Sequence, residues 1–264
     1  MCAAAAISIV ALIAFGASIA AAIPSAQSCA DNALAQAGDT SAPFVWVCPD
    51  GDGGFRTLTF DMPVDEDSFR NSIDKGILRF PSSGGDNPGS FVEPDDPFVK
   101  RIASYILDQT EGMHPNLRAY AALCFVQSTV AYIPDSQLWG TGEFRAFPTE
   151  TLFLRAGDCE DTAFLLCSIL EAMSFDTVLL DFDGHMAAGV KLDSCSGRGY
   201  ATERGTYWHC EPSSVSGTPI GVCHPMYAEE EPRIIFSDDS GDGLGFIGSA
   251  VAVYRNLIGA VLGI

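Results

Sequence analysis

One cysteine of this chain, Cys159, stands among three carboxylates in the sequence Gly-Asp-Cys-Glu-Asp of residues 157–161. The residues that follow, 162–173, are rich in apolar side chains and predict a mostly buried helix. Asp158 is a favourable N-cap and Asp161 stands three residues later, as in a capping box, which places Cys159 at the first helical position. The positive end of a helix dipole lowers a thiol pKa, whereas the neighbouring carboxylates raise it. A nucleophilic cysteine here therefore needs a cationic partner.

His185 is the candidate for that partner. It lies between two strand-like runs, 177–182 and 186–192, and a third such run, 206–211, ends in Glu211. Cysteine, histidine and acid on neighbouring elements supply the nucleophile, the base and the orienting carboxylate of acyl transfer. The alternative is purely structural, because most helical cysteines are small buried hydrophobic residues and most turn histidines only satisfy local hydrogen bonds.

Three blocks of the sequence resemble the microbial transglutaminase-like proteins, a group of papain-related cysteine enzymes. The blocks are Phe-Pro-Thr-Glu-Thr-Leu-Phe-Leu-Arg-Ala-Gly-Asp-Cys-Glu-Asp-Thr-Ala-Phe-Leu-Leu at 147–166, Gly-His-Met-Ala-Ala-Gly-Val at 184–190 and Tyr-Trp-His-Cys-Glu-Pro-Ser at 207–213. The resemblance covers roughly residues 98–236. It implies an α+β fold with a papain-like transglutaminase core, in which helices pack on an antiparallel sheet and the nucleophile lies at a helix N-terminus.

The same resemblance assigns roles to individual residues. Cys159 is implied to be the nucleophile, His185 the general base and Glu211 the orienting acid. The family more often has Asp at the third position, and Glu211 is one methylene longer. Residues 125–132 also resemble a family segment, and Gln127 within it is a candidate to donate its amide N–H to the oxyanion. The alternative for Gln127 is a hydrogen bond to a neighbouring loop.

The charge of the chain excludes one class of partner. Asp and Glu outnumber Lys and Arg by 34 to 14, which gives a formal net charge of −20 over 264 residues. Without a basic stripe, the chain is not expected to bind nucleic acid. Such a surface repels acidic substrates and anionic lipid, and a salty habitat or weak divalent-cation binding would also account for it. No cofactor and no metal are expected.

Composition divides the chain into segments. Residues 3–23 form an apolar run without a charge, long enough for a signal peptide or a membrane anchor. An exported protein is therefore expected, either secreted or anchored in the membrane by this run. The predicted segments are a signal peptide or N-terminal membrane anchor (1–24), an irregular N-terminal extension (25–97), the catalytic domain (98–236), and a polar hinge with an apolar C-terminal helix (237–264).

The chain has nine cysteines. An exported location permits disulfides, and Cys29 and Cys48 are placed to close one loop. Two of the three cysteines after the histidine strand are candidates for a second pair; these three are Cys195, Cys210 and Cys223. A zinc site is the rival use of the same three, completed by His209 and His224, although no Cys-x-x-Cys spacing supports it.

The expected function is hydrolysis of peptide or amide bonds in a peptide or protein substrate, through a thioester acyl-enzyme. Two alternatives stay open. One is a catalytically silent binding module with the same fold, and the other is an acyltransferase that crosslinks proteins. The preference for hydrolysis comes from the family resemblance and not from any single residue.

Overall fold

The structure is a computed structural model, which describes residues 24–77, 79–80 and 87–238. The expected signal peptide or anchor and the expected C-terminal helix lie outside these ranges, apart from Pro24, Ser237 and Asp238. Within the described ranges, no helix has both the length and the apolar character that crossing a bilayer requires.

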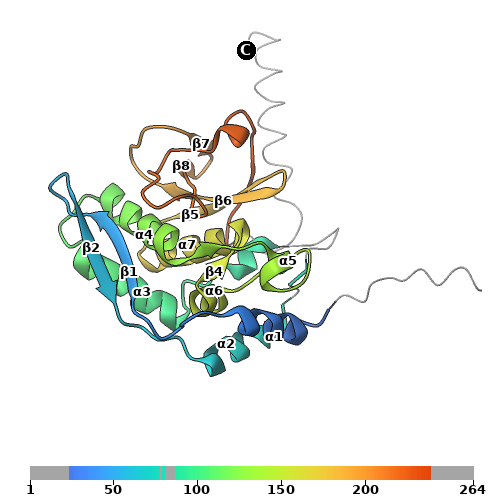
Figure 1. Cartoon of the computed structure of the whole chain (residues 1–264). Coiled ribbons are helices and arrows are strands. Elements are labelled where there is room, and N and C mark those ends of the chain that lie inside the picture. The colour runs from blue at the N-terminus through green and yellow to red at the C-terminus, as the bar shows by residue number, and fades with distance from the viewer. Residues whose placement is uncertain (1–23, 78, 81–86, 239–264) are drawn as a thin grey trace, which may run out of the picture.

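The described residues form an α+β fold (Figure 1). The helices are α1 (Ala26–Gln36), α2 (Glu66–Ile73), α3 (Pro97–Gln109), α4 (Pro115–Thr129), α5 (Asp135–Leu138), α6 (Pro148–Leu154) and α7 (Cys159–Ala172), with short 3-10 turns η1 (Pro88–Phe91) and η2 (Pro225–Tyr227). The strands are β1 (Phe44–Pro49), β2 (Phe55–Phe60), β3 (Ala131–Tyr132), β4 (Ala156–Gly157), β5 (Thr177–Phe182), β6 (His185–Lys191), β7 (Gly199–Thr202), β8 (Gly205–Cys210) and β9 (Arg233–Ile235).

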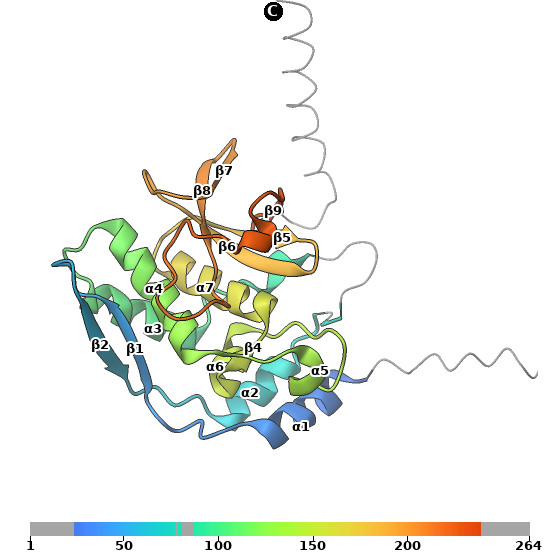
Figure 2. The ribbon, with the colours of Figure 1, turned by 45° about the horizontal axis from the view of Figure 1, so that its top comes forward.

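Helix α7 lies at the centre of the fold, with the sheet that contains β5 and β6 on one side and α3, α4 and α6 around it (Figure 2). Its start is as predicted, because the Asp158 carboxylate accepts a hydrogen bond from the Glu160 N–H at 3.1 Å and the Asp161 carboxylate completes a capping box. Every residue from 161 to 170 is buried, as a helix surrounded by protein requires. The cap therefore fixes Cys159 as the first residue of a central helix.

The main sheet is antiparallel, with five strands in the order β7-β8-β6-β5-β9. Strands β5 and β6 form a tight hairpin in which Phe182 pairs with His185. Gly184 in the turn has a φ of 71°, which glycine adopts without steric strain. Strand β8 pairs with the other edge of β6, and Glu211 follows β8 directly. This order brings the start of β6 and the end of β8 to one end of the sheet.

The N-terminal segment 25–97 differs from the irregular extension that its Gly, Pro, Ser and Asp content predicted. It contains α1, α2 and the β1–β2 hairpin, and its buried side chains belong to the same hydrophobic core as α7. Phe44 and Trp46 alternate inward along β1 and pack on α4, where the rings of Phe44 and Phe125 are 5.5 Å apart. Short strands in which buried and exposed side chains alternate thus fold as part of the domain, although the composition of the residues around them is typical of loops.

A buried ion pair joins this N-terminal segment to α6. The Arg79 guanidinium donates to both oxygens of the Glu150 carboxylate at 2.7 Å, and the side chains are 2% and 0% exposed. Replacing Glu150 by Gln leaves the guanidinium buried without a counter-charge. We expect Glu150→Gln to lower the free energy of unfolding by about 3–5 kcal/mol, measured by urea denaturation.

The control for this prediction is an exposed ion pair. Lys100 and Asp95 approach to 2.6 Å, but their side chains are 57% and 93% exposed. Exposed pairs contribute at most about 1 kcal/mol, so Asp95→Asn is expected to change the denaturation midpoint very little. Equal losses in the two variants would contradict a special contribution of the buried pair.

Candidate active site

The three predicted catalytic residues come from three elements, and the structure brings two of them, His185 and Glu211, into direct contact. Cys159 is the first residue of α7, His185 is the first residue of β6, and Glu211 follows β8. The His185 Nε2 and Glu211 Oε2 atoms are 2.9 Å apart. An ionised carboxylate only accepts hydrogen bonds, so this contact places a hydrogen on Nε2 and leaves Nδ1 as the proton acceptor of a neutral ring.

Cys159 lies beside the start of β6. The backbone N–H of Met186, the residue after His185, donates a hydrogen bond to the Cys159 sulfur. Two tyrosines also lie near the sulfur: burial raises the pKa of Tyr132 and of Tyr227, and Cys159 raises both further. The Tyr227 ring stacks on His185, with ring centroids 4.6 Å apart and planes 12° apart. The Cys159 sulfur therefore lies beside the backbone at the start of β6, near two tyrosines, one of which stacks on the His185 ring.

The surroundings of Cys159 favour the neutral thiol. Burial raises its pKa to about 12, and the Asp158 carboxylate adds to the shift, while the Met186 N–H opposes it. From the sequence we expected the helix N-terminus to lower the pKa of Cys159 and the carboxylates to raise it. In the structure, burial and the carboxylates have the larger effect. A nucleophilic role for Cys159 would therefore need a base to remove the thiol proton.

Asp158 gives a test of this electrostatic account. Asn is as good an N-cap as Asp, so Asp158→Asn keeps the helix start and removes one negative charge near the sulfur. We expect the pKa of Cys159 to fall and its alkylation by iodoacetamide at pH 7.5 to become about ten-fold faster, as a shift of one pKa unit implies. Site-resolved mass spectrometry measures the rate, with the half-buried thiol of Cys195 as the internal reference. An unchanged rate at Cys159 would show that Asp158 does not govern the thiol.

The Glu211 carboxylate is buried yet strongly acidic. Burial raises its pKa, but hydrogen bonds from His185 and His209 outweigh that effect, and the pKa falls to about 2. Ser213 adds a third donor, its hydroxyl lying 2.9 Å from Oε1. Glu211 therefore stays ionised over the whole pH range in which the protein is expected to be folded and active. Its extra methylene relative to Asp does not prevent contact with His185.

Gln127 makes the contacts of the loop-binding alternative. Its Nε2 lies 3.1 Å from the Glu211 carbonyl and 3.1 Å from the Thr218 carbonyl, and its Oε1 accepts from the Gly217 N–H at 3.0 Å. Both amide hydrogens are thus engaged by backbone oxygens. In this arrangement Gln127 anchors the segment that follows Glu211, and the oxyanion role has no free N–H on this side chain.

A cluster of carboxylates includes the residues on both sides of Cys159 in the sequence, Asp158 and Glu160. Ligand atoms of Asp135, Asp158 and Asp161 lie within 4.8 Å of one another, and Asp135, Glu143 and Glu160 form a second, overlapping group. Such oxygens are what hard divalent cations bind, so these residues are the ones able to hold a metal. Burial followed by the Asp158 charge raises the pKa of Asp135 to about 9, and the same two causes raise the pKa of Asp161. Protonation is the alternative way to relieve the repulsion.

Each cysteine within the described residues is a free thiol. The disulfides that we expected are therefore wrong for this structure, both between Cys29 and Cys48 and within the set Cys195, Cys210 and Cys223. Cys29 and Cys48 are instead separately buried, on α1 and β1. Among the described residues, the groups of three or more potential metal ligands consist of carboxylates alone, so the zinc alternative gains no support.

Two features of the site escaped the sequence analysis. From the sequence we considered His209 only as a potential zinc ligand, yet its Nε2 lies 3.4 Å from Glu211 Oε2. The signal was the spacing of two residues along one strand, which puts both side chains on the same face. Asp135 was missed altogether, because it begins the short helix α5, which carries no pattern in the sequence that points to a site.

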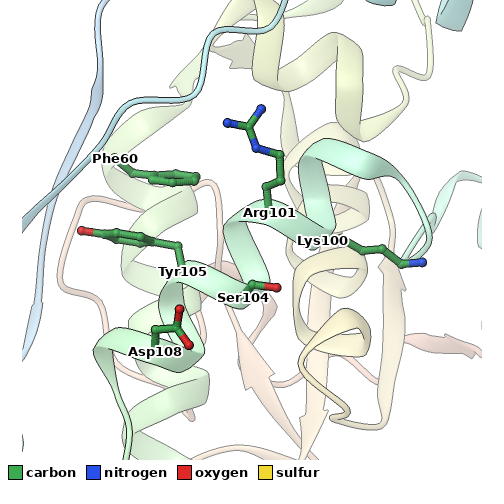
Figure 3. A pocket seen from close by; sticks show the side chains of 6 residues that line it. All are labelled: Phe60, Lys100, Arg101, Ser104, Tyr105 and Asp108. Carbon is green, nitrogen blue, oxygen red and sulfur yellow. The ribbon is translucent and has the colours of Figure 1, made fainter.

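A pocket of about 350 Å³ lies elsewhere, on β2 and α3 (Figure 3). The rings of Phe60 and Tyr105 stack there with centroids 4.4 Å apart. None of the predicted site residues lines this pocket, whose other lining residues are Lys100, Arg101, Ser104 and Asp108. It is a surface feature separate from the cysteine site.

A scan against models of known protein families finds no match to this chain, and a search of the curated proteins finds none either. The function proposed below is therefore argued from the geometry around Cys159 and from the sequence resemblance to transglutaminase-like proteins.

Proposed function

We propose that this protein is a cysteine hydrolase with a papain-like transglutaminase core, cleaving peptide or amide bonds through a thioester acyl-enzyme. One observation carries the proposal: the His185 Nε2 to Glu211 Oε2 contact of 2.9 Å, made by the residue next to Met186, whose N–H donates to the Cys159 sulfur. That contact orients the imidazole so that Nδ1 is the nitrogen able to accept a proton. The nucleophile, the base and the acid come from three separate elements of the fold. Their proximity therefore depends on the tertiary structure and not on one local stretch of sequence.

The reaction would proceed in two halves. His185 Nδ1 takes the proton of the Cys159 thiol as the sulfur attacks the carbonyl carbon, and then gives that proton to the nitrogen of the leaving amine as the C–N bond breaks. In the second half, water loses a proton to His185 and attacks the thioester carbon. The C–S bond breaks, the acid product leaves, and the sulfur regains the proton.

The N-terminus of α7 would stabilise the oxyanion. Cys159 is the first residue of the helix, so its backbone N–H has no partner within the helix and points out of the helix end. Negative charge on the carbonyl oxygen would be favoured there by this donor and by the helix dipole. The engaged amide of Gln127 leaves backbone N–H groups as the donors in this proposal.

The surroundings favour a particular substrate class. The carboxylates of Asp158, Glu160 and Asp161 act on Cys159, and Tyr132 and Tyr227 also lie near its sulfur. An acidic segment would be repelled, so we propose a peptide that is neutral or basic around the scissile bond. We also propose that the protein acts outside the cytoplasm, with 1–24 as its signal peptide or anchor.

The raised pKa of Cys159 is the specific observation that favours a second candidate, a binding module that keeps the fold without turnover. A thiol with a pKa of about 12 is a poor nucleophile unless the base acts on it. Activity that depends on both Cys159 and His185 separates the two candidates.

The test is turnover of a set of peptide amides by the full chain, followed by mass spectrometry. We expect hydrolysis by the wild type and a loss of at least about a thousand-fold in Cys159→Ala and in His185→Ala. Cys195→Ala removes a thiol outside the site and should leave turnover unchanged. Products that incorporate an added amine in preference to water would favour the crosslinking acyltransferase. Equal turnover in wild type and Cys159→Ala would overturn the proposal.

A further inference from the structure

Glu211 has more donors than an orienting acid needs. His185 and His209 both approach its Oε2 through Nε2, at 2.9 and 3.4 Å, and Ser213 binds Oε1. His209 is fully buried, and its backbone N–H is held by the Arg198 carbonyl at 3.0 Å. A second buried imidazole on the same carboxylate oxygen is thus built into the strand that carries the acid.

The hydrogen bonds behind His209 run in one direction. The Arg198 Nε lies 3.1 Å from the Tyr200 hydroxyl oxygen, which lies 3.1 Å from His209 Nδ1. Arginine can only donate, so the Tyr200 oxygen accepts from it and has its own hydrogen available for His209 Nδ1. Burial raises the pKa of Tyr200 to about 12, so the hydroxyl keeps that hydrogen at neutral pH. Cys223 is also near the hydroxyl, but sulfur is the weaker acceptor.

This direction sets the form of His209. An Nδ1 that accepts from Tyr200 carries no hydrogen, so the neutral ring has its hydrogen on Nε2, where it donates to Glu211. Glutamate has one more rotatable bond than aspartate, and the extra donor restrains the longer side chain. Glu211 Oε2 is then held in place as an acceptor for His185, which in turn keeps Nδ1 free for the thiol proton.

We propose that Tyr200 and His209 are positioning residues, which fix Glu211 and through it the tautomer of His185. The proposal deepens the hydrolase function and rests on it. Arg198 extends the same network, because its guanidinium also donates to the carbonyls of Ala228 and Glu230. These carbonyls follow Tyr227, whose ring stacks on His185. The partly exposed Arg198 therefore connects the residues that hold Glu211 to the segment whose Tyr227 ring stacks on His185.

The first experiment reads the tautomers without using turnover. The full chain has four histidines, so selective ¹⁵N-histidine labelling gives few signals, and long-range ¹H–¹⁵N spectra show which ring nitrogen carries hydrogen. We expect His185 and His209 both to carry it on Nε2. In Tyr200→Phe we expect His209 to gain the Nδ1–H form and the His185 Nε2–H to exchange faster with water. A hydrogen on His209 Nδ1 in the wild type, or spectra unchanged by Tyr200→Phe, would overturn the proposal.

The second experiment measures turnover. Loss of one neutral hydrogen bond predicts a fall of about five- to ten-fold in kcat for Tyr200→Phe, with KM unchanged. His209→Gln retains an amide N–H for Glu211 and should keep more activity than His209→Leu. Tyr105→Phe removes a hydroxyl that donates to the Thr59 carbonyl at 3.0 Å, away from the site, and is the matched control.

The two experiments separate this inference from the proposed function. Absence of turnover in the wild type, together with the expected tautomers and their response to Tyr200→Phe, would reject the hydrolase and support the positioning network. Turnover that requires Cys159 but is indifferent to Tyr200→Phe, His209→Gln and His209→Leu would support the hydrolase and reject the network. If His209→Leu fails to fold, the comparison of Tyr200→Phe with Tyr105→Phe still decides.

Discussion

Glu211→Gln is expected to lower kcat for amide hydrolysis by roughly a thousand-fold, with KM little changed. In the proposed reaction the carboxylate would stabilise the imidazolium that forms when His185 takes the thiol proton, and the neutral amide cannot. The amide keeps an oxygen toward His185 only if its NH2 group turns to Ser213. In the other orientation His185 is driven to carry hydrogen on Nδ1, the wrong nitrogen for a base.

The pH dependence sharpens this prediction. Because the pKa of Glu211 is lowered to about 2, its ionisation is complete above about pH 3 and contributes no limb to the activity profile at higher pH. We therefore expect the loss in Glu211→Gln to be similar from pH 5 to pH 9. A steady-state series over this range measures it.

Two further variants control for charge and length. Glu211→Asp keeps the charge and shortens the side chain by one methylene, to the length more common in the family that the sequence resembles, so a smaller loss is expected. Glu203→Gln removes an exposed carboxylate at the β7–β8 turn and should leave kcat unchanged. If Glu211→Gln retained nearly full activity, Glu211 would be an ordinary strand-end carboxylate with no part in the reaction.

What the sequence predicted well has short-range causes. The capping box at the start of α7 needs only two acidic residues three positions apart, Asp158 and Asp161. The β5–β6 hairpin needs only Asp-Gly between two apolar runs. Their bounds therefore came out close to the observed ones. The position of Glu211 at a strand end followed in the same way from the run that precedes it.

What the sequence did not predict depends on contacts across long separations. The Gln127 amide meets carbonyls 84 and 91 residues away, which no local pattern specifies. The same holds for the core contacts of the N-terminal segment and for the meeting of Asp135 with Asp161. The cysteines show the same limit. The expected export suggested disulfides, but whether two thiols can pair depends on their distance in the folded structure.

We expect the free energy of unfolding to fall as the pH rises, because Asp135 in the carboxylate cluster loses its proton on unfolding. Asp135 is 2% exposed, its Oδ2 accepts from the Phe144 N–H at 2.5 Å, and its Oδ1 has no hydrogen-bond partner among the described residues. Burial, then the charge of Asp158, raises its pKa from 3.8 to about 9. In the unfolded chain the same group titrates near its ordinary value.

The sign follows from proton binding. Between about pH 4 and pH 9 the folded state holds a proton on Asp135 that the unfolded state has lost, so stability falls as pH rises through this window. The contribution is fully present below the unfolded pKa and is gone above the folded one. One proton of difference corresponds to a slope of about 1.4 kcal/mol per pH unit.

Asp135→Asn removes this titration while keeping the shape of the side chain. We therefore expect the free energy of unfolding of the variant, relative to wild type, to rise by up to about 1.4 kcal/mol for each pH unit between pH 6 and pH 9. Urea denaturation with EDTA present measures it without a bound cation, and Asp193→Asn, an exposed carboxylate, is the control. If added calcium makes the wild type more stable than the variant at pH 9, the cluster is held by a cation there. Parallel pH profiles of the two proteins in EDTA would instead show that Asp135 is ionised in the fold and that its charge is relieved in some other way.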